Sequence, residues 1–179
     1  MKKYFKVVCI LSCIPDAYTC ASWRVASPPE WKYEKEAINL RLRADPLLNL
    51  YEGSPHPLSV CVYQFGDPNA FNQLAGYDDG LYKLLECDRF DAGVTSSKRL
   101  IVHPGENLTY AFDRADGAKY VAIVAGYYML QKEGMVRLFE IPVVVGRVGL
   151  LRLTKVSRPG ALNVDLVLGT QQIQKIEEK

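Results

Sequence analysis

The chain has 179 residues, of which 49% are hydrophobic and 23% charged, with 22 lysines and arginines against 20 aspartates and glutamates. That length fits one domain with a real core, and a net charge of +2 gives no electrostatic basis for binding nucleic acid. No apolar run reaches the ~18 residues of a spanning helix, and two histidines without a Cys-x-x-Cys pair argue against a zinc site.

The start of the chain has the features of a bacterial lipoprotein signal peptide. Two lysines near the N-terminus precede a short apolar core, residues 7–11. The sequence ILSC at residues 10–13 then resembles a lipobox, in which the thiol receives a diacylglycerol and the chain is cut before it. We therefore predict a signal peptide at 1–12 and a lipid anchor at Cys13. The alternative is that residues 4–14 form the first strand of a cytosolic protein.

A lipid anchor would decide where the protein lives. Each buried methylene adds about 0.8 kcal/mol, so a multiply acylated cysteine holds a domain on a bilayer almost permanently. The residue after the predicted anchor is Ile14. In Gram-negative lipoproteins an aspartate at that place retains the protein in the inner membrane, so the resemblance implies the outer membrane, with the domain facing the periplasm.

Residues 13–33 show no clean helix or strand period. Pro28 and Pro29 stiffen this stretch and exclude helix there. We interpret it as a lipidated tether, with Trp23 and Trp31 packing back onto the domain.

The folded domain is predicted at 34–170 and begins with a strand. Ile38, Leu40 and Leu42 alternate with polar residues, which is typical of a half-buried strand. A loop at 45–57 contains three prolines, and a second strand follows.

Two short helices are predicted after that second strand. Asp67 caps the first, over residues 68–75, and Asp78 or Asp79 caps the second, which carries Leu81, Leu84 and Leu85 on one side. The strands, separated by turns with Gly or Pro, are predicted at 36–43, 58–65, 96–103, 107–113, 119–128, 136–145, 148–156 and 162–168. Residues 171–179 form a polar tail that we expect to fray. About eight strands with two inserted helices indicate an all-β protein, a β-sandwich.

No motif for catalysis or for phosphate binding occurs in the sequence. An enzyme would need a carboxylate pair such as Asp88 and Asp91 to converge on His103, but these residues occupy separate turns, where aspartate is favoured for its short acceptor side chain. We predict no enzyme activity, no catalytic residues, no metal and no cofactor.

Cys61 and Cys87 are the two cysteines of the predicted folded domain. In an oxidising periplasm they would form a disulfide worth about 3 kcal/mol. Equally, they would be two buried free thiols that pack as small hydrophobes. The sequence leaves both alternatives open.

Several short motifs, in order, resemble the TssJ (SciN) family. The matching segments cover about residues 36–145 and are Leu48-Asn49, PHPLSVCVYQF at 55–65, Asn69-Ala70-Phe71, Leu74, Leu84-Leu85, His103-Pro104-Gly105, Asp113-Arg114, Ala118-Lys119-Tyr120-Val121 and Ala125-Gly126-Tyr127-Tyr128.

The resemblance implies a transthyretin-like two-sheet β-sandwich with added helices. It also implies an outer-membrane lipoprotein of the bacterial type VI secretion system, which binds the periplasmic C-terminal region of the inner-membrane protein TssM and acts with TssL. In that family the loop between the first two strands contributes to TssM binding. The corresponding partner-binding residues here are Leu47, Leu48, Asn49, Leu50 and Tyr51.

The residues themselves pose the same question about this loop. The apolar sequence LLNLY is costly to leave in water, so it either packs onto the core or binds a partner. Our first hypothesis is a non-enzymatic, lipid-anchored assembly protein. The alternative is a periplasmic, transthyretin-like module for a small ligand, which requires a polar-lined pocket of about 300 Å³ or more.

Overall fold

A computed structural model describes residues 27–148 and 154–178 of the chain. Within these residues the strands are β1 (Glu34–Ala44), β2 (Leu58–Phe65), β3 (Val94–Val102), β4 (Asn107–Arg114), β5 (Tyr120–Ala125), β6 (Val136–Glu140), β7 (Val143–Val148), β8 (Thr154–Pro159), β9 (Leu162–Leu168) and β10 (Ile173–Glu178). The helices are short: α1 (Asn69–Leu74), α2 (Asp78–Leu85) and α3 (Lys132–Met135). None of these helices is long and apolar enough to cross a membrane.

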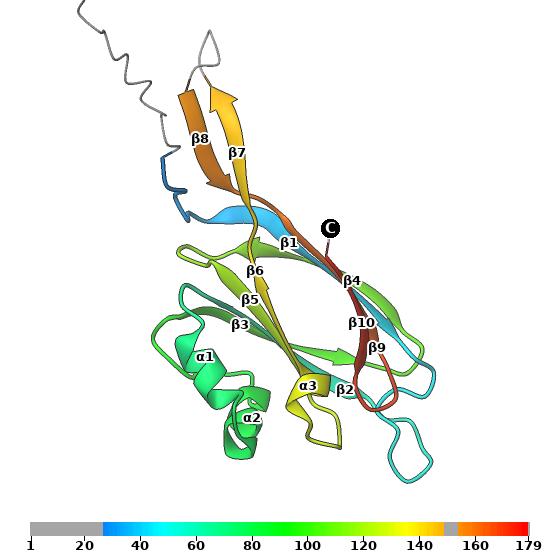
Figure 1. Cartoon of the computed structure of the whole chain (residues 1–179). Helices are drawn as coiled ribbons and strands as arrows, with labels where there is room; N and C mark the ends of the chain where they lie inside the picture. Colours follow the sequence, from blue (N-terminus) through cyan, green and yellow to red (C-terminus); the bar gives the residue numbers. More distant parts are fainter. Residues whose placement is uncertain (1–26, 149–153, 179) are drawn as a thin grey trace, which may run out of the picture.

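Eight strands form two four-stranded sheets that face each other (Figure 1). One sheet has the order β10-β9-β1-β4 and the other β3-β2-β5-β6. The larger hydrophobic core lies between them and includes Leu40, Val62, Ile123 and Leu166. The predicted two-sheet β-sandwich is confirmed.

The alternation predicted for the first strand is confirmed in β1. Ile38, Leu40 and Leu42 are buried, whereas Arg41 between them is exposed. β1 pairs antiparallel with β4 and parallel with β9, so it is an inner strand of its sheet.

β2 has a nearly continuous apolar sequence because both of its faces are covered. Val60 and Val62 point into the core between the sheets, while Tyr63 and Phe65 point into a second core under the helices. Helices α1 and α2 close that second core from outside (Figure 1), with Phe71 in contact with Phe65.

The helix starts differ in detail from the prediction. In α1 the N-cap is Pro68, without a side-chain cap, rather than the predicted Asp67, whose carboxylate accepts a 2.8 Å hydrogen bond from the Asn69 amide just before the helix. In α2 the N-cap is instead Tyr77, with no side-chain cap, and Asp78 and Asp79 lie in the first turn. Carboxylates in a first turn still stabilise the helix through its dipole.

The C-terminal third departs most from the predicted elements. Residues 171–179 were predicted to fray, but Ile173–Glu178 forms β10, which pairs antiparallel with β9. The strand predicted at 119–128 ends at Ala125. The single strand predicted at 136–145 is two strands, β6 and β7, because Pro142 has no amide to continue a ladder.

β7 and β8 form a separate two-stranded sheet that projects beyond the sandwich (Figure 1). We call this hairpin, the residues of β7 and β8, the β-arm. Ser27, the first described residue, makes a parallel bridge with Val156 of β8. Trp31 packs against the main core, as predicted for the tether, whereas Trp23 and Cys13 lie outside the described residues.

Candidate functional site

The loop between β1 and β2 is held by backbone hydrogen bonds at the end of the sandwich opposite the β-arm (Figure 1). The Leu48 amide donates to the Asp45 carbonyl at 2.9 Å, and the Leu50 amide donates to the Thr170 carbonyl at 2.8 Å. The His56 amide donates back to the Leu48 carbonyl at 3.0 Å. The loop 45–57 therefore has a defined shape.

Two of the five predicted partner-binding residues face inward. Leu48 is fully buried in the core between the sheets, and Asn49 is 4% exposed. Apolar burial and hydrogen bonding therefore remove these two of the predicted contact side chains from the surface of this structure. Leu47 and Tyr51 are exposed, and Leu50 is half-buried.

Asn49 joins the loop to the segment after β5. Its Nδ2 donates to the Pro57 carbonyl at 3.2 Å, and its Oδ1 accepts from the Tyr128 amide at 3.0 Å. Its φ is 48°, in the left-handed region that asparagine tolerates better than most side chains. Asn49 is therefore a positioning residue for the surface beside it.

That surface is aromatic. The rings of Tyr51 and Tyr128 stack with centroids 4.4 Å apart and an interplanar angle of 18°. The His56 ring approaches Tyr128 edge-on at 5.1 Å. We call Tyr51, His56 and Tyr128 the aromatic cluster.

Other apolar residues of the same two segments are exposed as well. Leu47 of the loop is 50% exposed and Met129, which follows Tyr128, is 48% exposed, while Tyr128 itself is 54% exposed. The stretch after β5 was missed as part of the site, although its Gly-Tyr-Tyr sequence belonged to the family resemblance. Only the hydrogen bond from the Tyr128 amide to Asn49 and the ring stacking reveal that this stretch adjoins the loop.

A hollow of about 420 Å³ lies next to the cluster. Asn49 and Tyr128 line it, and Tyr82 and Leu85 of α2 form another wall. The loop, the turn after β5 and α2 thus present one uneven apolar and aromatic surface. Aromatic side chains often anchor protein interfaces, because they bury a large area and lose little conformational entropy when they are fixed.

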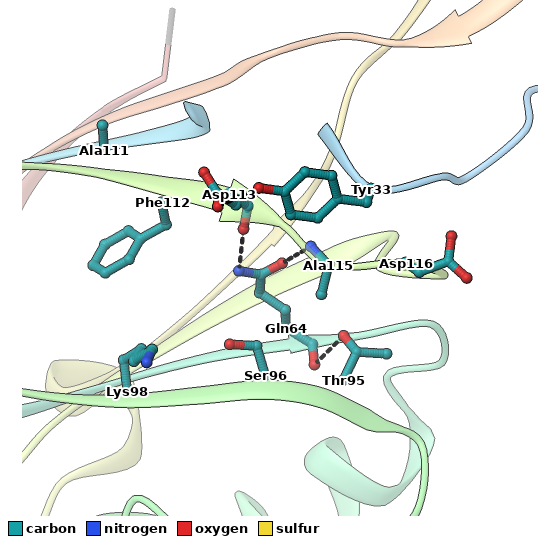
Figure 2. A pocket seen from close by; sticks show the side chains of 10 residues that line it. All are labelled: Tyr33, Gln64, Thr95, Ser96, Lys98, Ala111, Phe112, Asp113, Ala115 and Asp116. Carbon is teal, nitrogen blue, oxygen red and sulfur yellow. Dashed lines mark hydrogen bonds between the residues drawn. The ribbon is translucent and has the colours of Figure 1, made fainter. Parts of the chain in front are cut away.

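A second hollow, of about 530 Å³, lies where the edges of the two sheets meet (Figure 2). Its volume exceeds the size that we set for a ligand-binding module. Its polar groups, however, bind one another. Gln64 Nε2 donates to the Asp113 carbonyl at 2.9 Å, Gln64 Oε1 accepts from the Ala115 amide at 2.8 Å, and Thr95 donates to the Gln64 carbonyl at 3.0 Å. The two bonds of the Gln64 side chain join β2 of one sheet to the end of β4 in the other.

The Asp113 side chain in this hollow is likewise engaged. One carboxylate oxygen accepts a 2.5 Å hydrogen bond from the Tyr33 hydroxyl, and the other accepts from the Glu36 amide at 2.9 Å. The hydrogen bond from Tyr33, and then that from Glu36, lower the pKa of Asp113 below its usual value. The carboxylate therefore fixes the irregular start of β1.

Cys61 and Cys87 are joined in a disulfide, with Cα atoms 5.2 Å apart. The bond connects the middle of β2 to the end of α2. Beside it, the buried Tyr63 hydroxyl donates to the Leu84 carbonyl at 2.5 Å. Burial raises the pKa of Tyr63 to about 12.

The residues considered for an enzyme do not converge. Asp91 accepts a hydrogen bond from the Gly93 amide just before β3 begins, whereas His103 follows the last residue of β3. A strand of nine residues separates them by roughly 25 Å or more. Among the described residues, no group of three His, Cys, Asp or Glu side chains is arranged to hold a metal ion.

The molecule is thus a two-sheet β-sandwich with helices on one face, and its loop end carries an exposed aromatic and apolar surface. Residues 36–157, more than half of the chain, match the family model of the type VI secretion lipoproteins (VasD, EvfM, TssJ). The chain therefore belongs to the type VI secretion lipoprotein family. No curated protein matches it significantly.

Several solved structures have a similar fold. The type VI secretion lipoprotein TssJ1 from Pseudomonas aeruginosa is 19% identical with a TM-score of 0.58, and the match covers 85% of this chain and 98% of that one. Lip from Serratia marcescens, a membrane-bound component of the same type of system, is 17% identical with a TM-score of 0.55, covering 78% and 96%.

A third match is a chain in a structure described as the C-terminal domain (869–1107) of TssM from EAEC. It is 16% identical with a TM-score of 0.54, and the match covers 76% of this chain and 94% of that one. At such identities these likenesses establish the fold alone.

Proposed function

We propose that this protein is a non-enzymatic structural lipoprotein of the type VI secretion membrane complex. It is anchored in the outer membrane through Cys13, with its domain in the periplasm, and it binds the periplasmic C-terminal region of TssM, the inner-membrane component that acts with TssL. Family membership supports the general role. A chain of a structure described as a type VI membrane complex also has a similar fold.

One observation carries the choice of the docking surface. The exposed parts of the loop 45–57 and the aromatic cluster form one apolar surface, and Asn49 holds the two segments together. Because the loop is already ordered by backbone hydrogen bonds, little conformational entropy is lost when a partner binds. Leu47, Leu50 and Tyr51 remain as contacts, joined by Tyr128, while Leu48 and Asn49 support them from below.

The test replaces exposed residues only. The double variant Leu47→Glu, Tyr51→Glu should weaken binding to the TssM periplasmic region by at least about tenfold, since central interface aromatics commonly contribute 2 kcal/mol or more. The matched control is Leu138→Glu, Tyr77→Glu, which places the same charges on two exposed residues, one in β6 and one at the N-cap of α2. Calorimetry of all three proteins against the TssM fragment decides the matter, and equal affinities would reject the surface.

The anchor is tested separately. Palmitate labelling and membrane fractionation should show that the wild-type protein carries acyl chains and sediments with the outer membrane. The Cys13→Ser variant should lose both properties. Acylation that persists without Cys13, or an unlabelled wild-type protein in the soluble fraction, would reject the lipid anchor.

The ligand-binding alternative has less support. The hollow in Figure 2 is large enough, but the amide of Gln64 and the carboxylate of Asp113 already have protein partners. A ligand would have to displace hydrogen bonds that connect the sheets, which costs stability.

A further inference from the structure

The β-arm exposes an unusual number of apolar side chains. Val143, Val144 and Val145 are consecutive in β7 and are 44%, 45% and 59% exposed. Successive side chains of a strand point to opposite faces, so the exposed valines line both faces of the hairpin. Within the described residues, β7 pairs on one edge only, with β8.

The register also places two cations side by side. Val143 and Val145 share one face with Arg147, and Arg147 pairs directly with Lys155 of β8. Like charges in direct cross-strand positions repel each other. No ion pair with either side chain is formed in the part of the chain that the structure describes. This face of the β-arm is therefore apolar at Val143 and Val145 and positively charged at Arg147 and Lys155.

The charge of this region is one-sided in the sequence as well. Residues 141–164 contain no aspartate or glutamate, although the whole chain has 20 of them. The basic residues of the β-arm itself are Arg147, Lys155 and Arg158. A region that carries cations and no carboxylates attracts anions more strongly than it attracts a protein surface of mixed charge.

The β-arm lies on the side of the domain where the described chain begins, which is the side nearest in sequence to the proposed anchor. Ser27, the described residue that is nearest in sequence to Cys13, bridges Val156 of β8 and so lies beside the arm. Thirteen residues lie between Cys13 and Ser27 in the sequence, so a fully extended chain from one to the other would reach roughly 50 Å at most. The loop 45–57 lies at the other end of the molecule (Figure 1).

We propose that the β-arm lies on the anionic phospholipid surface of the membrane that holds the anchor. Val143 and Val145 enter the boundary between headgroups and acyl chains, and Arg147 and Lys155 bind lipid phosphates. The anionic surface removes the repulsion between the paired cations. This inference rests on the proposed function. It orients the anchored domain, with the β-arm toward the membrane and the docking loop facing away from it.

A protein strand added to the free edge of β7 is the competing explanation for the exposed valines. Two observations favour lipid. The chain that leads to the anchor pairs with the arm, and the arm carries cations without any carboxylate. Polybasic segments beside an anchor strengthen attachment to anionic lipids.

The test uses the full chain with Cys13→Ser, so that acylation plays no part. Flotation is measured with vesicles of phosphatidylethanolamine and phosphatidylglycerol (3:1) and with vesicles of phosphatidylcholine. The protein should bind the anionic vesicles more tightly. Neutralising Arg147→Gln and Lys155→Gln should weaken that binding about 25-fold, since each cation near an anionic surface contributes about fivefold. Val143→Thr with Val145→Thr, which keeps strand propensity, should weaken it about fivefold or more.

Matched controls remove the same groups elsewhere. Lys83→Gln with Lys98→Gln, and Tyr77→Ser with Leu138→Ser, should leave vesicle binding within about twofold of the parent. Urea midpoints of all variants exclude unfolding as the cause. If the arm variants bind vesicles as well as the controls do, the proposal is overturned.

The outcomes remain separable from those of the proposed function. Loss of TssM binding in the valine variant with unchanged vesicle binding would assign the arm to a protein partner instead. A failure of palmitate labelling would remove the anchor but would leave the vesicle result intact, since the tested chain carries no lipid.

Discussion

The side chain of Asn49 accepts a 3.0 Å hydrogen bond from the backbone amide of Tyr128, although 79 residues separate them in the chain. This contact joins the loop 45–57 to the turn after β5 and aligns the stacked rings of Tyr51 and Tyr128. The proposed docking surface therefore depends on a residue that is itself buried.

Replacing Asn49 should loosen the surface and lower stability together. Asn49→Ala leaves the Tyr128 amide and the Pro57 carbonyl without their partner and places alanine at φ 48°. We expect a loss of about 2–3 kcal/mol in the free energy of unfolding, measured by urea denaturation, and weaker TssM binding in calorimetry. Asn49→Gly removes the backbone strain but does not restore the side-chain hydrogen bonds. Compared with Asn49→Ala, it should therefore recover part of the stability and little of the binding. Full recovery of binding by glycine would contradict the positioning role.

The two neighbouring leucines of the loop, Leu47 and Leu48, should contribute very differently to stability. Leu48→Ala removes a fully buried side chain and should cost about 2–5 kcal/mol of stability. Leu47→Ala changes an exposed side chain and should stay within about 0.5 kcal/mol of the wild type. Urea midpoints of the two variants compare them directly. Similar losses at both positions would mean that the loop packs differently from this structure.

The disulfide between Cys61 and Cys87 should be detectable and stabilising. Denatured protein alkylated without reductant should leave these two thiols unmodified, and reductant should add two alkyl groups to its intact mass. The Cys61→Ala, Cys87→Ala variant should lose about 3 kcal/mol, because the bond closes a loop with a sequence separation of 26. Two thiols alkylated in denaturant alone would show that the bond does not form in solution.

Tyr63 should make stability depend on alkaline pH. Its folded pKa is about 12, raised first of all by burial, whereas an unfolded tyrosine titrates near 10. Between these values the unfolded chain loses a proton that the folded protein keeps, so the free energy of unfolding falls as pH rises. This stabilising contribution is complete below pH 10 and is lost through pH 12.

The variant Tyr63→Phe isolates that contribution. It should be less stable at pH 8 by about 1 kcal/mol, because the hydrogen bond to the Leu84 carbonyl is lost. The gap to wild type should narrow above pH 10, measured by urea denaturation at stepped pH. Burial raises the pKa of Tyr127 too, so the variant keeps some alkaline sensitivity. A constant gap would show that Tyr63 titrates normally.

Side-chain periodicity accounts for the elements that were predicted well. β9 begins and ends at the residues expected, 162 and 168, because its buried and half-buried side chains alternate regularly. β2 is also placed at 58–65, since a short run of apolar and β-branched residues between turns is typical of a buried strand. In both cases the signal lies in neighbouring residues.

Elements held by backbone contacts were missed for the opposite reason. β10 has a mostly polar sequence in which Ile173 is a buried core residue, so its place beside β9 relies largely on main-chain hydrogen bonds that carry no side-chain signature. The break between β6 and β7 separates the sandwich from the β-arm, although the residues on both sides of it are similarly apolar.

By itself the sequence determined the β-sandwich class, the helical insertion after β2 and the family, because alternation and the order of motifs are local properties. Only the tertiary structure decided which leucine of the loop is buried, which tyrosine stands beside Tyr51, and that the valines of β7 stay outside the core. Each of these depends on contacts between segments far apart in the chain. The local sequence around an apolar residue is the same whether or not a distant segment covers that residue.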